Sequence, residues 1–151
     1  MTLSCEITTN RIVSVLSISP IEEDHCALQD ILSSLQSAMD PSRTFTVSSC
    51  TTLDAGLAVL QNRQFEVIVC EQDLRPGSWR DVLQQVVILP TPPSLIVTSR
   101  LADEPLWAEV LNLGAYDVLA KPFDRAEVTR VVNGGWRAWG GSNSCAAGMQ
   151  V

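Results

Sequence analysis

A nearly continuous apolar run at residues 65–70, F-E-V-I-V-C, constrains the fold of this chain more than any other segment. Such runs are typical of strands that are buried on both faces, as the strands of parallel sheets are. Neighbouring parallel strands are joined by long crossover connections, which are usually helices. Helices are therefore expected between this strand and the other short apolar segments of the chain.

Five strands and five helices are expected to alternate along the chain. Segments rich in β-branched and apolar residues predict strands, and apolar residues spaced three and four apart predict helices. The expected strands are residues 11–19, 44–49, 65–70, 94–98 and 117–120. The expected helices run from 22 to before 40, from a cap at 51–54 to 60, and over 79–87, 104–113 and 125–132. This order predicts one α/β domain with a parallel sheet and right-handed crossovers.

Both ends of the chain are expected to lie outside this domain. Residues 1–10 form an N-terminal extension, and residues 11–139 form the domain. Asn133-Gly134-Gly135 is expected to end or disrupt the fifth helix. Residues 140–151 are rich in Gly, Ser and Ala without an apolar period, which predicts a disordered tail.

Composition narrows the classes of function. A length of 151 residues with 46% apolar residues suits one domain, and the net charge of −7 argues against binding to nucleic acid. No apolar run is long enough for a membrane helix and no signal peptide is evident, so we expect a cytoplasmic protein without a membrane partner. Five cysteines without a C-x-x-C pair predict free thiols. The single histidine, His25, is expected to be solvated and without a role.

Polar residues at the carboxyl ends of the strands are the candidates for a site, because ligands of such sheets bind at that edge. These positions are Ser19 and Pro20 after the first strand, Glu71 after the third, Thr98 in the fourth and Lys121 after the fifth. Lys121 is the only lysine of the chain.

Four motifs stand at these strand ends. They are F-E-V-I-V-C followed by Glu71, the loop L-R-P-G-S-W, the strand end L-I-V-T-S, and G-A-Y-D-V-L-A-K-P-F at residues 114–123. Over residues 11–139 the chain resembles the receiver domain of two-component response regulators. The resemblance implies a flavodoxin-like five-stranded parallel sheet with helices on both faces. It also implies a place in a phosphorelay, an aspartate that accepts a phosphoryl group, and a divalent ion.

This chain departs from the family pattern at the phospho-acceptor, metal-binding and switch positions. The phospho-acceptor aspartate falls on Glu71, and the two metal-binding acidic residues fall on Ser19 and Pro20. The switch aromatic falls on Val118. The hydroxyl residue is retained as Thr98 and the lysine as Lys121, whose bond to Pro122 the resemblance implies is cis.

These departures predict a degenerate domain, a pseudo-receiver. Mg²⁺ is held largely by carboxylates, so its site is expected to be lost, leaving no cofactor. The longer side chain of Glu71 is expected to imitate a permanent phosphate, with Lys121 as its counter-ion and Thr98 as a hydrogen-bond donor. We therefore expect a phosphorylation-independent signalling module that is not an enzyme.

Two alternative interpretations remain: a receiver domain that can still be phosphorylated, and one domain of a longer protein. Phosphorylation could use Asp73 as acceptor, or a metal site rebuilt from Glu22, Glu23 and Asp24, although acidic residues in a first helical turn usually face the helix dipole. The chain could also be the input domain of a longer transcriptional regulator.

The expected partner surface is the face of the fourth helix, fifth strand and fifth helix, which domains of this family use. Leu101, Leu106, Trp107 and Tyr116 are its candidate anchors. Leu106 and Trp107 are adjacent in a helix, so both cannot point into the core. The partner would be a histidine kinase, an output protein or a second copy of the chain.

Overall fold

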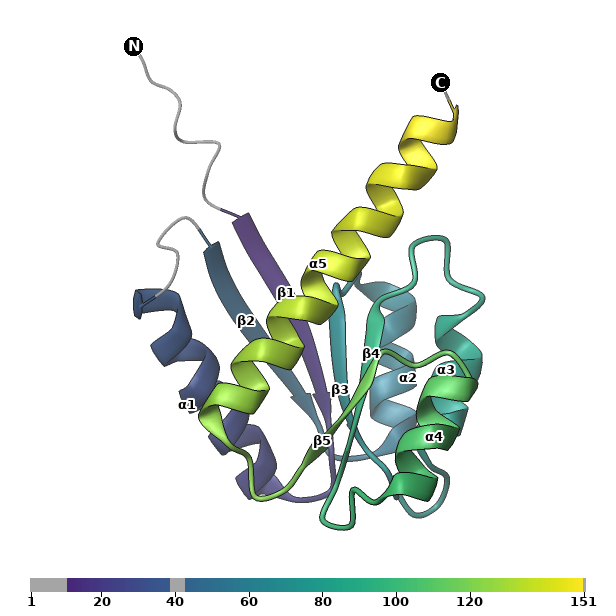
Figure 1. The fold of residues 1–151 in the computed structure, drawn as a ribbon. Coiled ribbons are helices and arrows are strands. Elements are labelled where there is room, and N and C mark those ends of the chain that lie inside the picture. The colour runs from purple at the N-terminus through teal and green to yellow at the C-terminus, as the bar shows by residue number, and fades with distance from the viewer. Residues whose placement is uncertain (1–10, 39–42, 151) are drawn as a thin grey trace.

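The computed structural model describes residues 11–38 and 43–150, which form a five-stranded parallel sheet between two layers of helices (Figure 1). The strand order is β2-β1-β3-β4-β5. The strands are β1 (Arg11–Ile18), β2 (Arg43–Cys50), β3 (Val67–Glu71), β4 (Ser94–Ser99) and β5 (Asp117–Ala120). The helices are α1 (Glu22–Ala38), α2 (Leu53–Asn62), α3 (Trp79–Val86), α4 (Glu104–Asn112) and α5 (Arg125–Gln150). The expected flavodoxin-like fold is confirmed.

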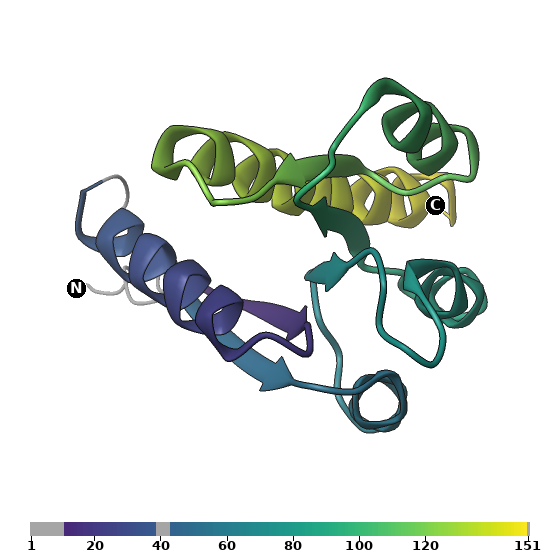
Figure 2. The ribbon, with the colours of Figure 1, turned by 90° about the horizontal axis from the view of Figure 1, so that it is seen from below.

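Helices cover both faces of the sheet (Figure 2), and each face carries its own apolar core. Alternate residues of β1 point to opposite faces, so Val13 and Val15 enter one core while Leu16 and Ile18 enter the other. The first core lies under α1 and α5, and the second lies under α2, α3 and α4. Burial on both sides explains why the strands are apolar runs.

Local capping signals set where several helices begin. The Thr52 side chain accepts a hydrogen bond from the backbone N–H of Ala55 at the start of α2. Ser78 and Asp81 form a capping box at α3, and Asp103 caps α4. Each cap satisfies backbone donors that the first helical turn leaves unpaired. The loops that precede these helices are therefore held at the carboxyl edge of the sheet.

The end expected for the fifth helix at Asn133 is wrong. α5 passes through Gly134 and Gly135 and continues to Gln150, so residues 140–150, expected as a disordered tail, lie in a helix. A Cβ atom on Gly134 would collide with the hydroxyl of Tyr116. The glycine therefore permits a close approach between α5 and Tyr116, and this packing outweighs its poor helix propensity.

The structure also describes the cysteines and the lengths of the helices. The cysteines at 26, 50 and 70 are free, and burial raises the pKa of the Cys50 and Cys70 thiols. In the described part of the chain, no helix has the length and apolar character needed to span a bilayer. The N-terminal extension, residues 1–10, and residue 151 lie outside the described residues.

Candidate functional site

Parallel pairing brings the expected site residues to one edge of the sheet. In the register of β3 with β4, Glu71 lies beside Thr98. In the register of β4 with β5, Ser99 lies beside Ala120, so Lys121 follows at the same edge. The Lys121–Pro122 peptide bond is cis, as expected.

An ion triad forms the centre of this edge. The Nζ atom of Lys121 lies 2.5 Å from Glu71 Oε1 and 2.6 Å from Asp24 Oδ2. The side chain of Lys121 is only 5% exposed, and those of Glu71 and Asp24 are 13% and 14% exposed. The ion pair expected between Glu71 and Lys121 is present, and α1 supplies a second carboxylate that the sequence did not lead us to expect there.

Two hydroxyl groups hold the carboxylates of the triad. Thr98 Oγ1 donates to Glu71 Oε1 at 3.2 Å, and Ser19 Oγ donates to Asp24 Oδ2 at 2.7 Å. The backbone N–H of Ile21 donates to Ser19 Oγ at 3.1 Å, which fixes this hydroxyl in the turn between β1 and α1. Each of these carboxylate oxygens thus accepts a hydroxyl hydrogen bond as well as contacting the ammonium group.

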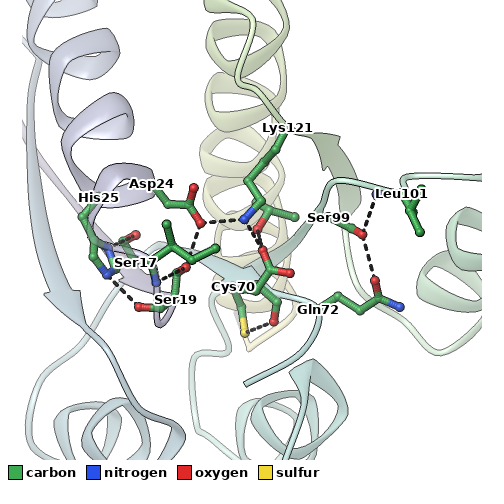
Figure 3. A network of polar contacts seen from close by, with 12 residues as sticks. Ser17, Ser19, Asp24, His25, Cys70, Gln72, Ser99, Leu101 and Lys121 are labelled. Carbon is green, nitrogen blue, oxygen red and sulfur yellow. Dashed lines mark hydrogen bonds and ion pairs between the residues drawn. The ribbon is translucent and has the colours of Figure 1, made fainter. Parts of the chain in front are cut away.

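His25 is buried, so the expectation that it is solvated is wrong. Its ring is 3% exposed, with Nδ1 lying 2.7 Å from Ser17 Oγ and Nε2 donating to the carbonyl oxygen of Ser19 at 2.9 Å (Figure 3). A carbonyl can only accept, so Nε2 carries the proton. The first turn of α1 packs against the end of β1, and this contact places the ring inside the protein.

A sequence signal for this arrangement existed. Ser17 in β1 and Ser19 just after it are buried polar residues beside apolar ones, and buried hydroxyl groups need partners. The partners come from α1, where His25 and Asp24 occupy adjacent positions. A position in the first turn of α1 predicts that Asp24 faces the helix dipole, whereas its carboxylate turns toward Lys121 (Figure 3).

The alternative acidic residues lie elsewhere. Asp73 pairs with Arg75, whose Nε lies 2.6 Å from Asp73 Oδ2, and the Asp73 side chain is about half exposed. Glu22 and Glu23 are exposed, so among the three acidic residues of this turn only Asp24 contacts Lys121. The geometry gives no support to an acceptor at Asp73 or to a metal site built from the three.

The remaining expected residues divide between core and surface. Val118 is buried in the core under α2, α3 and α4, and Pro20 is exposed. Leu106 is 5% exposed, so its expected role as a surface anchor is wrong, because it points into the same core. Trp107, by contrast, is 51% exposed. This agrees with the expectation that Leu106 and Trp107, as neighbours in a helix, cannot both point into the core. Tyr116 is partly buried against the other core.

The residues present do not suit a Mg²⁺ ion. Ser19 and Pro20 supply no carboxylate, and the space between Asp24 and Glu71 holds the ammonium group of Lys121. Mg²⁺ requires near-octahedral oxygen ligation, and a second cation beside an ammonium group is repelled. Within residues 11–38 and 43–150, no three His, Cys, Asp or Glu side chains gather in an arrangement that could hold a metal ion.

Comparison with solved structures shows the same fold in several signalling proteins. The signal receiver domain of an HD domain-containing protein from Pseudomonas fluorescens is 19% identical, with a TM-score of 0.74 over 95% of this chain and 96% of that one. The chemotaxis response regulator CheY4 of Vibrio cholerae is 14% identical, with a TM-score of 0.68 over 81% and 97%. The beryllofluoride-activated NtrC4 receiver domain dimer is 17% identical, with a TM-score of 0.72 over 83% and 98%.

Comparison with protein families identifies the chain itself. No individual curated protein matches it. The sequence profile of the response regulator receiver domain matches residues 21–133. With three quarters of its length matched and the fold shared, the chain belongs to the response regulator receiver domain family.

Proposed function

We propose that this receiver domain signals without phosphorylation, as a protein-interaction module whose pocket is permanently closed by an internal ion triad. The observation that carries the proposal is the position of Lys121, whose buried ammonium group contacts both Glu71 and Asp24. The hydroxyl of Thr98 also donates to the Glu71 oxygen that Lys121 contacts. One oxygen of the carboxylate at the acceptor position, Glu71 Oε1, is therefore engaged by two groups of the protein.

The charge of the pocket supports this proposal. Two carboxylates and one ammonium group leave a formal charge of −1, and a phosphoryl donor would bring further negative charge. Phosphoryl transfer depends on neutralising that charge, usually with a divalent ion. Since Ser19 and Pro20 cannot supply the carboxylates for such an ion, the domain is proposed to need no cofactor and to catalyse no transfer.

The switch position supports a fixed signalling state. In the resemblance, an aromatic side chain at position 118 would report on the pocket, whereas Val118 is small and buried in the core. The surface formed by α4, β5 and α5 is then independent of the pocket. Trp107 and Leu101 are exposed there or beside it, and large exposed apolar residues suit an interface. We propose that this face binds another signalling protein or a second copy of the chain; the NtrC4 receiver neighbour is a dimer.

Intact-mass measurement after incubation with acetyl phosphate and Mg²⁺ tests the proposal. The wild-type chain is expected to show no phosphate adduct, while a receiver domain with a complete acidic pair serves as the positive control. An adduct on the wild-type chain would refute the proposal. The Asp73→Asn and Glu71→Gln variants would then show which carboxylate accepts the phosphoryl group.

A further inference from the structure

The edge of the sheet opposite the ion triad carries an apolar groove. It lies between the end of α3, the α3–β4 loop, the turn before β5 and α5, and its volume is about 450 Å³. Val87 lines this amino-edge groove and is 61% exposed, and Ile88 and Leu113, next in sequence to lining residues, are 72% and 50% exposed. Apolar surface of this kind suits a protein partner. The buried residues of the floor and the residues of the rim are Leu83, Val86, Leu95, Ala115, Val87 and Trp139.

We propose that the amino-edge groove binds the C-terminal part of α5 from a second copy of the chain. Residues 140–150 form this part, the α5 extension, and two copies exchange their extensions about a two-fold axis near Gly140. Neither the triad residues nor Trp107 line the groove. The inference therefore goes beyond the proposed function, which concerns the pocket and the outer face of α4.

The α5 extension leaves the domain. Ser94 Oγ donates to the carbonyl oxygen of Gly135 at 2.7 Å, which ties the middle of α5 to the start of β4. A Cβ atom at Gly140 would meet no atom of the rest of the described domain within 4 Å, and Figure 1 shows the yellow end of α5 projecting past the amino ends of the strands. Glycines stand at positions 140, 141 and 148, and a short glycine-rich helix without packing is marginal in water. A second surface is therefore needed to stabilise the extension.

The relative positions of groove and extension favour a second copy as the occupant. Ala138 and Trp139, which directly precede the extension, line the groove. α5 is one continuous helix, so its extension runs away from the groove at its own base. Where two α5 helices cross in antiparallel directions near Gly140, each extension lies over the groove of the other chain, and both contacts form together. Small residues at the crossing permit a close approach of the two helix axes.

Charge also favours this contact between identical chains. Each copy has a net charge of −7, which opposes association through charged surfaces. Among the described residues that line the groove there is no Asp, Glu, Lys or Arg, and residues 140–150 contain none either. Two copies therefore meet at these surfaces without bringing like charges together.

A disulfide bond between chains tests the contact directly. Cys145 belongs to the extension, and Val87→Cys places a second thiol on the rim of the groove. Full-length ¹⁵N-labelled and unlabelled chains of this variant are mixed with oxidised glutathione, which accepts the two electrons and two protons released as the S–S bond forms. Mass spectrometry of the non-reduced digest is expected to find positions 87 and 145 joined between labelled and unlabelled chains.

Two other thiols control for random collision. Cys26 is exposed, and Trp107→Cys places a thiol on the outer face of α4. Thiols that meet only by diffusion lack the high effective concentration of a bound pair, so the link between positions 87 and 145 should form at least about tenfold faster than links from position 107 or Cys26 to Cys145. Equal rates would overturn the inference, as would links between positions 87 and 145 that form only within single chains.

A matched pair of substitutions at Ser144 tests the need for a helical extension. Ser144→Pro interrupts the helix, whereas Ser144→Ala keeps it. Both are measured in the full chain with Trp107→Ala, which removes the anchor proposed on α4. In sedimentation equilibrium, Ser144→Pro is expected to weaken self-association at least about tenfold, and Ser144→Ala to leave it unchanged or strengthen it. Equal association of the two variants, or a Trp107→Ala chain that is monomeric, would contradict the exchange of extensions.

A charge on the groove rim tests the other side of the contact. Val87→Glu places a carboxylate on the rim, and Gln84→Glu adds the same charge at an exposed position of α3 that does not line the groove. Val87→Glu is expected to weaken self-association at least about tenfold, and Gln84→Glu to leave it nearly unchanged. Thermal unfolding confirms that both variants fold. A folded Val87→Glu variant that associates as the wild type does would rule out the groove as the binding surface.

The proposed function and this inference fail in different experiments. A phosphate adduct on the wild-type chain would refute the proposed function and leave the link between positions 87 and 145 unchanged. Absence of that link, together with equal association of the two Ser144 variants, would refute only the exchange of extensions and would leave the groove to a partner other than a second copy.

Discussion

Two regions of the molecule differ in which side chains they bury. The carboxyl edge of the sheet buries charged side chains, and the outer face of α4 exposes large apolar ones. At the edge, the charged side chains of Lys121, Glu71 and Asp24 are buried and paired with one another. Near α4, the large apolar side chains of Trp107 and Leu101 are exposed to solvent. The first region satisfies its groups within the chain, and the second leaves apolar surface uncovered.

The two regions are therefore expected to contribute to different properties, the first to the stability of the fold and the second to binding of a partner. A buried charge without a partner is costly, so each member of the triad depends on the others for the native state. An exposed apolar side chain contributes little to folding, but its burial against another molecule favours association. Substitutions at the edge should therefore change the free energy of unfolding, whereas substitutions on the outer face of α4 should change binding.

Loss of the lysine charge is expected to have the largest effect on stability. Lys121→Met leaves two buried carboxylates facing each other, and breaking a buried ion pair costs about 3–5 kcal/mol. Urea unfolding without divalent ions measures the change. Arg130→Met, at an exposed position, is the matched control and should change stability by less than about 0.5 kcal/mol. A loss below about 1 kcal/mol for Lys121→Met would show that the triad is no source of stability.

Removal of the buried imidazole is expected to have the next largest effect. His25→Leu leaves the hydroxyl of Ser17 and the carbonyl of Ser19 without their partner, and an unsatisfied buried group costs about 1–3 kcal/mol. Gln29→Ala, at an exposed position of the same helix, controls for changes in α1. Equal stability of His25→Leu and the wild type in urea unfolding would contradict a structural role for these hydrogen bonds.

The sequence predicted the strand ends of the site but not its helical contribution. Glu71 and Lys121 follow apolar strands, and parallel pairing must bring such positions together. Asp24 and His25 lie in the first turn of α1, where the direction of a side chain depends on how the helix is rotated against the sheet. The turn at Ser19 and Pro20 sets that rotation through hydrogen bonds that periodicity does not reveal.

The fifth helix shows a second limit of sequence reasoning. A Gly-Gly pair weakens a helix by its local propensity, so the segment at Asn133 suggested an end. In the structure, Gly135 is buried and Gly134 faces the hydroxyl of Tyr116. The glycines are explained by a partner 18 or more residues away in sequence, and tertiary packing of this kind overrides propensity.

A pair of glycine substitutions in α5 sharpens this point with a smaller effect. Gly134→Ala would place a methyl group against Tyr116, and overpacking of about 1–3 kcal/mol offsets a helix-propensity gain of about 1 kcal/mol. Gly140→Ala meets no atom within 4 Å and should gain stability. Thermal unfolding compares the two variants. A stabilised Gly134→Ala would indicate that the Tyr116 ring moves aside without cost.

The smallest effect on stability is expected at Trp107. Its ring is half exposed and its Nε1 donates to Asp117 in an exposed hydrogen bond of 3.3 Å, so Trp107→Ala should change unfolding by less than about 1 kcal/mol. Sedimentation velocity should instead show weaker self-association, because exposed tryptophans are frequent anchors of interfaces. Glu71→Gln is the matched variant from the other region and should leave self-association nearly unchanged. If Glu71→Gln weakened self-association more than Trp107→Ala did, the pocket would control the α4 surface. Val118 would then not prevent a change at Glu71 from reaching that surface.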